Sequence, residues 1–181
     1  MEIRFVSGNQ FKIDETKEIM LGSGIDIIPF NKKIEELQTL DVRSLVKDKL
    51  MKAFGLIGRP LFVEHTGLYI KYLNEFPAGL TQIFWDSLEA DKFAELMGKL
   101  PDTTVLAKTI IGYCDGMNIH YFEGEVDGNI VDIPRGNRDF QWDCIFLPKG
   151  ESLTFAEMGS AKNNISMRKQ ALEKFKNYLT L

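Results

Sequence analysis

The sequence predicts a mixed α/β protein, because two different patterns occupy its first and middle thirds. In the first third, short apolar runs at 3–6 and 25–30 alternate with helical patterns, the second of them from about 41 to 57. In the middle, β-branched and apolar runs lie on either side of Asp115-Gly116, which is a hairpin signal. The first pattern is typical of parallel strand–helix units, and the second is typical of an antiparallel meander.

The other elements are predicted from their own local signals. In chain order they are a helix after Asn9, helices at 80–88 and 90–98, strands at 103–114 and 117–126, a turn at Asp127-Gly128, a strand at 129–133, a helical turn at 154–158 and a helix at about 160–179. The sequence shows no internal repeat, low-complexity tract or flexible linker. We therefore expect a single domain over residues 1–181.

Composition narrows the class of partner and the compartment. The 22 basic and 26 acidic residues give a net charge of −4, which argues against nucleic acid as the main partner. Cys114 and Cys144 match no metal-ligand spacing, so a reduced intracellular setting is expected. The N-terminal residues lack the long apolar core of a signal peptide and no window approaches a membrane span, so we expect neither. We expect a cytoplasmic protein with no membrane partner.

The segment from Leu61 to Leu68 combines a buried strand with ionisable residues. Three apolar residues precede Glu64, His65 and Thr66, which are expected at the carboxyl end of the strand. Ligands of open α/β sheets bind at such strand ends. The alternative is an ordinary strand followed by a polar turn.

A phosphate site is indicated where the first helix begins. Ser7-Gly8-Asn9 forms a polar turn with Asn9 as the expected N-cap, and the free N–H groups behind it can bind an anion. Lys12 falls in the first helical turn, where the helix dipole disfavours a cation unless an anion is near. The alternative is an exposed lysine on an ordinary helix. The glycine spacing of a Walker loop is absent.

Three further groups of residues suit a nucleoside triphosphate. Cations recur at the expected start of the last helix, and acids at strand or loop positions suit Mg²⁺ beside phosphate oxygens. An aromatic loop containing an acid could stack on a base. Taken singly, each acid is as well explained by a solvated or capping role. The cations are Lys162 and Arg168, the acids suited to Mg²⁺ are Glu36 and Glu64, and the aromatic loop contains Phe140, Trp142 and Asp143.

Five segments then occur in the order and spacing of a known family. They are Ser-Gly-Asn-Gln-Phe-Lys at 7–12, Glu-Leu-Gln at 36–38, the Pro-Arg-Gly to Phe-Gln-Trp-Asp loop at 134–143, Thr-Phe-Ala-Glu-Met at 154–158 and Lys-Asn-Asn-Ile-Ser-Met-Arg at 162–168. Together they resemble the inosine triphosphate pyrophosphatase family, hydrolases of non-canonical purine nucleoside triphosphates. The resemblance covers nearly the whole chain.

The resemblance implies an elongated mixed sheet flanked by helices, with two lobes around a central nucleotide cleft. It also implies a homodimer and Mg²⁺-dependent hydrolysis (Mn²⁺ being an alternative ion) of the triphosphate to monophosphate and pyrophosphate. Carried over by motif, Glu64 and His65 are the expected catalytic residues, and Glu36 and Glu64 the expected metal ligands. The expected substrate-binding residues are Ser7, Asn9, Lys12, Lys49, Thr66, Phe140, Trp142, Asp143, Lys162, Met167 and Arg168.

Five positions depart from the family pattern, all within the expected site. His65 stands where the family has a proposed catalytic aspartate, and an imidazole can accept a proton but is a poor Mg²⁺ ligand. Gln82 and its neighbours stand where the family offers a basic residue to the phosphates. The remaining departures are Gln141 for glycine, Cys144 for proline and Met167 for histidine.

These departures leave three hypotheses. The first is an active pyrophosphatase, with altered base selectivity or metal use. The second is a nucleotide-binding protein with weakened or lost catalysis, in a sensor or regulatory role. The third is a folded relative that keeps no nucleotide site.

Overall fold

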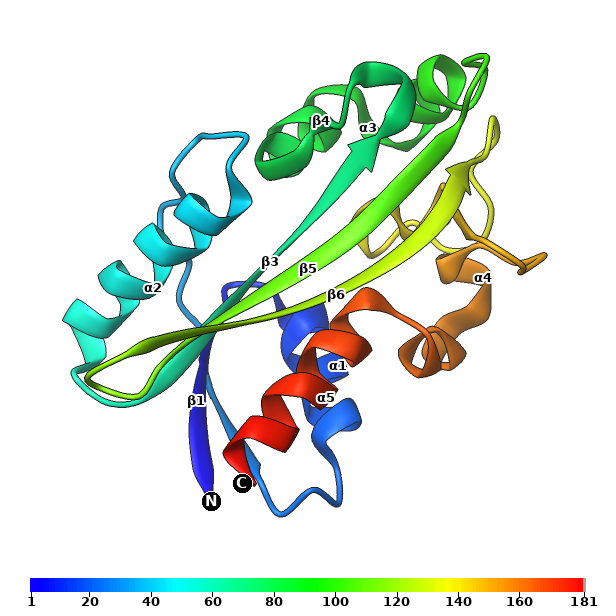
Figure 1. The fold of residues 1–181 in the computed structure, drawn as a ribbon. Coiled ribbons are helices and arrows are strands. Elements are labelled where there is room, and N and C mark those ends of the chain that lie inside the picture. The colour runs from blue at the N-terminus through cyan, green and yellow to red at the C-terminus, as the bar shows by residue number, and fades with distance from the viewer. Residues whose placement is uncertain (181) are drawn as a thin grey trace.

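Among residues 1–180, which the computed structural model describes, an open mixed sheet of seven strands forms the centre of the molecule (Figure 1). The strand order is β2-β1-β3-β5-β6-β7, and β4 pairs with β3. The pairs that β1 makes with β2 and β3 are parallel, and the other pairs are antiparallel. The strands are β1 (Glu2–Val6), β2 (Asp26–Phe30), β3 (Leu61–Ile70), β4 (Phe76–Pro77), β5 (Thr104–Cys114), β6 (Ile119–Ile130) and β7 (Phe146–Pro148). The predicted mixed sheet is confirmed.

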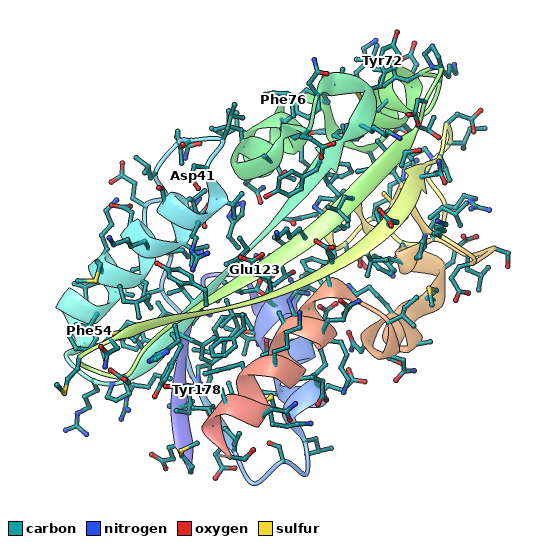
Figure 2. The ribbon with its side chains drawn as sticks, viewed as in Figure 1. Asp41, Phe54, Tyr72, Phe76, Glu123 and Tyr178 are labelled. Atoms are coloured by element: carbon teal, nitrogen blue, oxygen red, sulfur yellow. The ribbon has the colours of Figure 1, made fainter. Side chains whose placement is uncertain are left out.

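Five α-helices flank this sheet, and short 3₁₀ helices connect the remaining segments. Asn9, Asp41 and Ser166 each accept a backbone N–H bond at the start of a helix, which is the standard N-cap role. The helices are α1 (Gln10–Met20), α2 (Val42–Ile57), α3 (Thr81–Met97), α4 (Phe155–Met158) and α5 (Met167–Leu179), with 3₁₀ helices η1 (Lys71–Leu73), η2 (Ala78–Leu80), η3 (Gln141–Cys144) and η4 (Gly159–Asn164). Figure 2 shows Asp41 where α2 begins and Phe54 towards its other end. Within the described residues, no helix has both the length and the apolarity to cross a membrane.

Strand β3 contributes to each of the three apolar cores found within residues 1–180. Leu61 and Val63 pack with α2, whereas Phe62 packs with α1 and α5 on the opposite face. Leu68 and Ile70 belong to a third core, which α3, η3 and α4 cover. Figure 1 shows the same division, with α2 on one side of the long strands and α1 with α5 on the other. The polar segment 64–66 therefore lies where the three cores meet.

The structure corrects the prediction that Glu64, His65 and Thr66 lie at the end of their strand. They lie in the middle of β3, because β5 pairs with this strand along its whole length. The strand end beside them is that of β1, which stops at Val6 after pairing with β3 only as far as Phe62. From Val63 to Leu68, β3 therefore has no β1 partner on that side, and the cleft opens there.

Two other predicted boundaries were wrong. The expected turn at Asp127-Gly128 lies inside β6, where a Cβ on Gly128 would come within 2.6 Å of the Leu147 carbonyl oxygen. The glycine thus permits close approach of β7 instead of a turn. The helix expected from about 160 begins at Met167, because Ser166 is its cap and 159–164 forms η4. The predicted break between 80–88 and 90–98 is confirmed as a kink in α3 at Glu89.

Candidate active site

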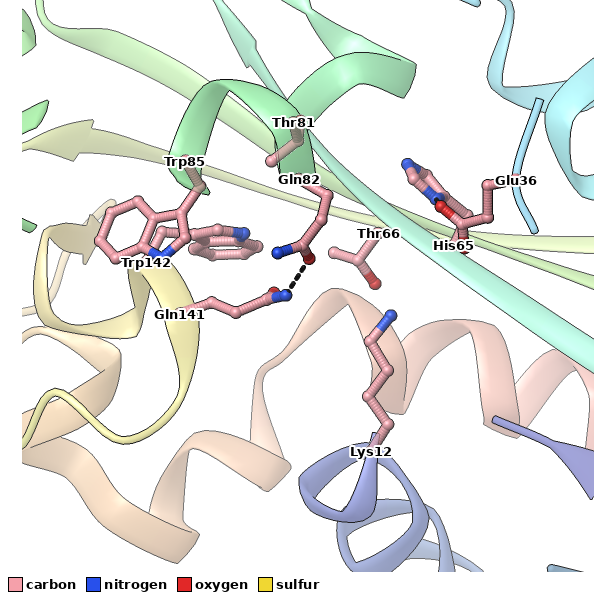
Figure 3. Close-up of a pocket in the computed structure, with 9 residues that line it drawn as sticks. All are labelled: Lys12, Glu36, His65, Thr66, Thr81, Gln82, Trp85, Gln141 and Trp142. Atoms are coloured by element: carbon pink, nitrogen blue, oxygen red, sulfur yellow. Dashed lines mark hydrogen bonds and ion pairs between the residues drawn. The ribbon is translucent and has the colours of Figure 1, made fainter. Parts of the chain in front are cut away.

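The cleft beside β3 consists of an outer groove and an inner recess. The groove has a volume of about 530 Å³, and its walls include Ser7, Asn9, Lys12, Glu36 and Lys49. The recess is smaller, about 30 Å³, and is lined by Lys12, Glu36, His65, Thr66, Thr81, Gln82, Trp85, Gln141 and Trp142. Figure 3 shows the two tryptophans on one side of the recess and Glu36 with His65 on the other.

A buried ion cluster centred on Glu64 joins α1 and α5 to the sheet. Arg168 donates from Nε to Glu64 Oε2 at 2.8 Å and from its guanidinium NH2 group to Oε1 at 3.1 Å. Lys12 Nζ lies 2.9 Å from the same Oε1. Burial alone would raise the pKa of Glu64, but Arg168 and Lys12 hold that pKa well below its usual range. Glu64 is therefore ionised, and both of its oxygens are engaged.

A second cluster lies at Glu36, on the α2 side of β3. Lys49 Nζ donates to Glu36 Oε1 at 2.6 Å and to the Glu64 backbone carbonyl at 3.2 Å. His65 Nδ1 lies 3.6 Å from Glu36 Oε2, and His65 Nε2 is buried with no hydrogen-bond partner among residues 1–180. Burial lowers the pKa of His65, although Glu36 opposes this shift. The imidazole is thus neutral near pH 7, with one nitrogen unpaired.

A third cluster surrounds Lys162 at the base of the aromatic loop. Lys162 Nζ donates to Asp143 Oδ2 at 2.6 Å and also pairs with Glu15. Glu15 pairs with Arg168 too, so this cluster is continuous with the one at Glu64. Burial raises the pKa of Asp143 to about 6, against the opposing effect of Lys162. The Phe140 ring centroid lies 4.5 Å from Lys162 Nζ and 5.3 Å from that of Phe11.

The predicted site residues thus divide into cleft walls and a buried layer beneath them. Asp143, Lys162 and Arg168 come together, but in ion pairs and not in the walls of the groove or the recess. Trp142 is 3% exposed, packs on Phe146 and reaches the recess, and its Nε1 has no hydrogen-bond partner in the described part of the chain. Met167 is 1% exposed in the third core, because its apolar side chain packs there, so the structure gives no support to its predicted substrate contact.

Sequence reasoning missed several residues of this site. Glu15 lies three residues after Lys12 in α1, so the helical period places both on one face, and this spacing was a usable signal. Thr81 donates to the Ala78 carbonyl and accepts from the backbone N–H of Leu68, which satisfies part of the free edge of β3. Trp85 packs against the third core, beside Phe93, and also lines the recess. No local signal marked Thr81 or Trp85, because only the fold brings α3 to this edge.

The fold and the cleft define a class, namely α/β proteins whose open sheet carries a cleft lined by paired lysines and carboxylates.

Residues 3–178 match the Ham1 family. An inosine triphosphate pyrophosphatase of Yarrowia lipolytica is 36% identical and is aligned over 99% of this chain and 96% of its own length. A dITP/XTP pyrophosphatase of Methanopyrus kandleri is 33% identical and is aligned over 97% of this chain and 94% of its own length. The solved structure of a HAM1 protein from Coxiella burnetii superimposes with a TM-score of 0.84 at 26% sequence identity. The superposition covers 99% of this chain and 98% of that protein. The chain belongs to the Ham1 family.

Proposed function

We propose that the protein hydrolyses non-canonical purine nucleoside triphosphates, of the ITP, dITP or XTP type, to the monophosphate and pyrophosphate. One observation supports this most: cations from four separate segments gather at one cleft, two in its walls and two in the buried layer beneath them, and each is held by a carboxylate. They are Lys12 of α1, Lys49 of α2, Lys162 of η4 and Arg168 of α5. Burying a cation is costly for a fold even when it is paired, so three buried cations and the largely covered Lys12 beside one cleft suit a site for a polyanion. The names of the full-length relatives point to the same substrates.

The residues present suit a divalent cation at Glu36. Its side chain is 25% exposed and lines the groove, whereas both Glu64 oxygens are engaged by Lys12 and Arg168. No three His, Cys, Asp or Glu side chains gather as a metal cluster within residues 1–180. Mg²⁺ needs none, since it binds through one or two carboxylates together with substrate phosphates. Glu36 would hold Mg²⁺ or Mn²⁺, whereas Glu64, the other expected ligand, accepts bonds from Arg168 at both oxygens. The ion supplies charge neutralisation at the phosphates.

The chain's own residues perform binding and proton transfer in this proposal. Lys12 and the N–H groups at the start of α1 bind the phosphates, because a helix N-terminus and a lysine both favour an anion. Water attacks the α-phosphorus, the bond to the bridging oxygen of the β-phosphate breaks, and pyrophosphate leaves. The unpaired Nε2 of His65 accepts the proton of the attacking water, and Glu36 orients the ring through Nδ1.

A nucleotide-binding protein with weakened or lost catalysis is the alternative, in a sensor or regulatory role. The observation that favours it is that the cations of the candidate site are already paired with its carboxylates. Glu64 accepts bonds from two cations, and His65 replaces the aspartate expected from the family motif. In this alternative the carboxylates are structural partners of the cations, and no group activates water.

Pyrophosphate release from a panel of ITP, dITP, XTP, ATP and GTP, with Mg²⁺ and then Mn²⁺, tests the proposal. We expect turnover of the first three in preference to ATP and GTP. Lys12→Ala should lower kcat/KM by about 10²–10³-fold, since it removes a contact to developing phosphate charge. Lys174→Ala is the matched control, because Lys174 is exposed on α5 and bonds only the Glu123 carbonyl. Nucleotide binding without any turnover by the parent protein would instead support the alternative.

A further inference from the structure

Two glutamines from distant parts of the chain meet across the cleft. Gln141 of η3 donates from Nε2 to Oε1 of Gln82 in the first turn of α3 (Figure 3). Gln82 in turn donates from Nε2 to Asp86 Oδ1 at 2.7 Å, one helical turn further along α3. The contact with Asp86 orients the amide of Gln82, so that its oxygen faces Gln141.

This glutamine pair lies where the outer groove meets the inner recess. Both glutamines line both spaces, as Lys12 and Glu36 do. Lys12 and Glu36 come from α1 and the segment before α2, whereas the two glutamines link α3 to η3. A ligand that spans the groove and the recess would therefore contact this hydrogen-bonded pair.

The backbone conformation of Gln141 is unfavourable for a residue with a side chain. Its φ is +44°, a left-handed conformation that favours glycine and is strained for a glutamine. The family pattern has glycine at this position, and it offers a basic residue within the segment 81–83 that contains Gln82. The two departures are thus hydrogen-bonded to each other, and this bond depends on a glutamine side chain at the strained position.

A second contact ties the same loop to α3 outside the cleft. Arg138 donates to both carboxylate oxygens of Asp91, at 2.7 and 2.8 Å. This bidentate pair can keep the loop on α3 while the neutral amide pair opens. The inner and outer contacts can therefore be separated by mutation.

We propose that Gln82 and Gln141 form a gate between the outer groove and the inner recess, whose hydrogen bond opens to admit a nucleoside triphosphate and closes behind it. The identity of the ligand rests on the proposed function. The gate itself rests on the contact, on its position between the two spaces and on the strained backbone of Gln141.

The two tryptophans of the chain, Trp85 and Trp142, both line the recess, so intrinsic fluorescence reports directly on its opening. Acrylamide quenching is measured on the parent protein, Gln82→Ala, Gln141→Gly and the double variant. We expect higher quenching constants in both single variants, and in the double variant no further increase, because either change removes the same bond. Gln170→Ala is the matched control, since Gln170 also bridges two elements, accepting from the Glu125 N–H far from the cleft.

Unchanged quenching in both single variants, or additive increases in the double variant, would overturn the gate. Arg138→Ala separates the two contacts: quenching close to that of the parent supports the inner pair as the gate, and an increase equal to that of Gln141→Gly contradicts it. Stopped-flow mixing with ITP and Mg²⁺ follows the same fluorescence, and Gln141→Gly should accelerate association. Failure of parent and variants alike to bind ITP counts against the proposed function, whereas the acrylamide comparison alone decides the gate.

Discussion

Arg168 carries a full positive charge at a position that is only 1% exposed. Burial alone would lower its pKa, but the carboxylates of Glu64 and Glu15 outweigh this effect and raise it. The same contacts tie the start of α5 to the middle of β3 and to α1. Residues of the candidate site are therefore also structural links, and a substitution there changes stability as well as binding.

Arg168→Met should destabilise the fold by about 3–5 kcal/mol, because it leaves the buried Glu64 without its bidentate partner. The free energy of unfolding is measured by urea denaturation at pH 7. Lys174→Met on the exposed face of the same helix serves as control and should change stability by about 0.5 kcal/mol or less. Equal losses in the two variants would show that the buried pairing contributes little.

Asp143 should make stability depend on pH in the acid range. Burial raises its pKa to about 6 in the folded protein, above its ordinary value of 3.8. Because the folded pKa is the higher one, the stabilising effect of protonated Asp143 is complete below pH 3.8 and is lost as the pH rises through about 6. The loss is on the order of 3 kcal/mol.

Asp143→Asn removes this titration, so the variant should match the parent near pH 4 and gain relative to it by pH 7. Urea denaturation of both proteins, in steps of one pH unit, measures the difference between their free energies of unfolding. The contributions of the other carboxylates are common to both proteins and cancel in this difference. A difference that stays constant with pH would contradict the assigned pKa.

At the scale of elements, α3 shows most clearly how a local conflict is resolved by the fold. Its helical pattern is interrupted at Glu89, which has φ 54° and ψ 179°. Such a conformation is otherwise found almost only at glycine. The kink lets the first half of α3 face the cleft with Gln82 and Trp85, while the second half packs Phe93 and Ala94 into the third core.

Glu89→Gly should therefore stabilise the protein by about 1 kcal/mol, since relief of backbone strain exceeds the entropy lost on ordering a glycine. Glu95→Gly, on an exposed position in the regular second half of α3, should instead cost about 1 kcal/mol. Thermal unfolding of both variants beside the parent measures the two effects. Equal losses of stability in the two variants would show that Glu89 is not strained.

At the scale of the whole molecule, the cleft lies where three apolar cores meet along β3. Each core is packed by its own helices, and the polar residues 64–66 occupy the junction between the cores. A ligand that contacts α1, α2 and α3 at once would link these parts and stabilise all of them together. The expected homodimer and cytoplasmic location stay predictions.

ITP with Mg²⁺ at about 100 times its Kd should therefore raise the free energy of unfolding by about 2.7 kcal/mol. The shift in Tm is followed by calorimetry while the nucleotide concentration is varied, with a catalytically slow variant such as His65→Gln to limit turnover. Lys12→Ala should remove most of the shift, and Lys174→Ala should keep it. A Tm that is independent of ITP in the parent protein would contradict nucleotide binding.

The sequence by itself determined the mixed α/β class, most helices and the polar turn capped by Asn9 that precedes Lys12. These features depend on caps, glycines and periodicity that act over a few residues. Only the tertiary structure decided the rest. It placed Glu64, His65 and Thr66 in the middle of β3, because β5 extends that strand while β1 ends early. It also paired Arg168 with Glu15 and Gln141 with Gln82. Such contacts join residues far apart in the chain, and no local pattern can specify them.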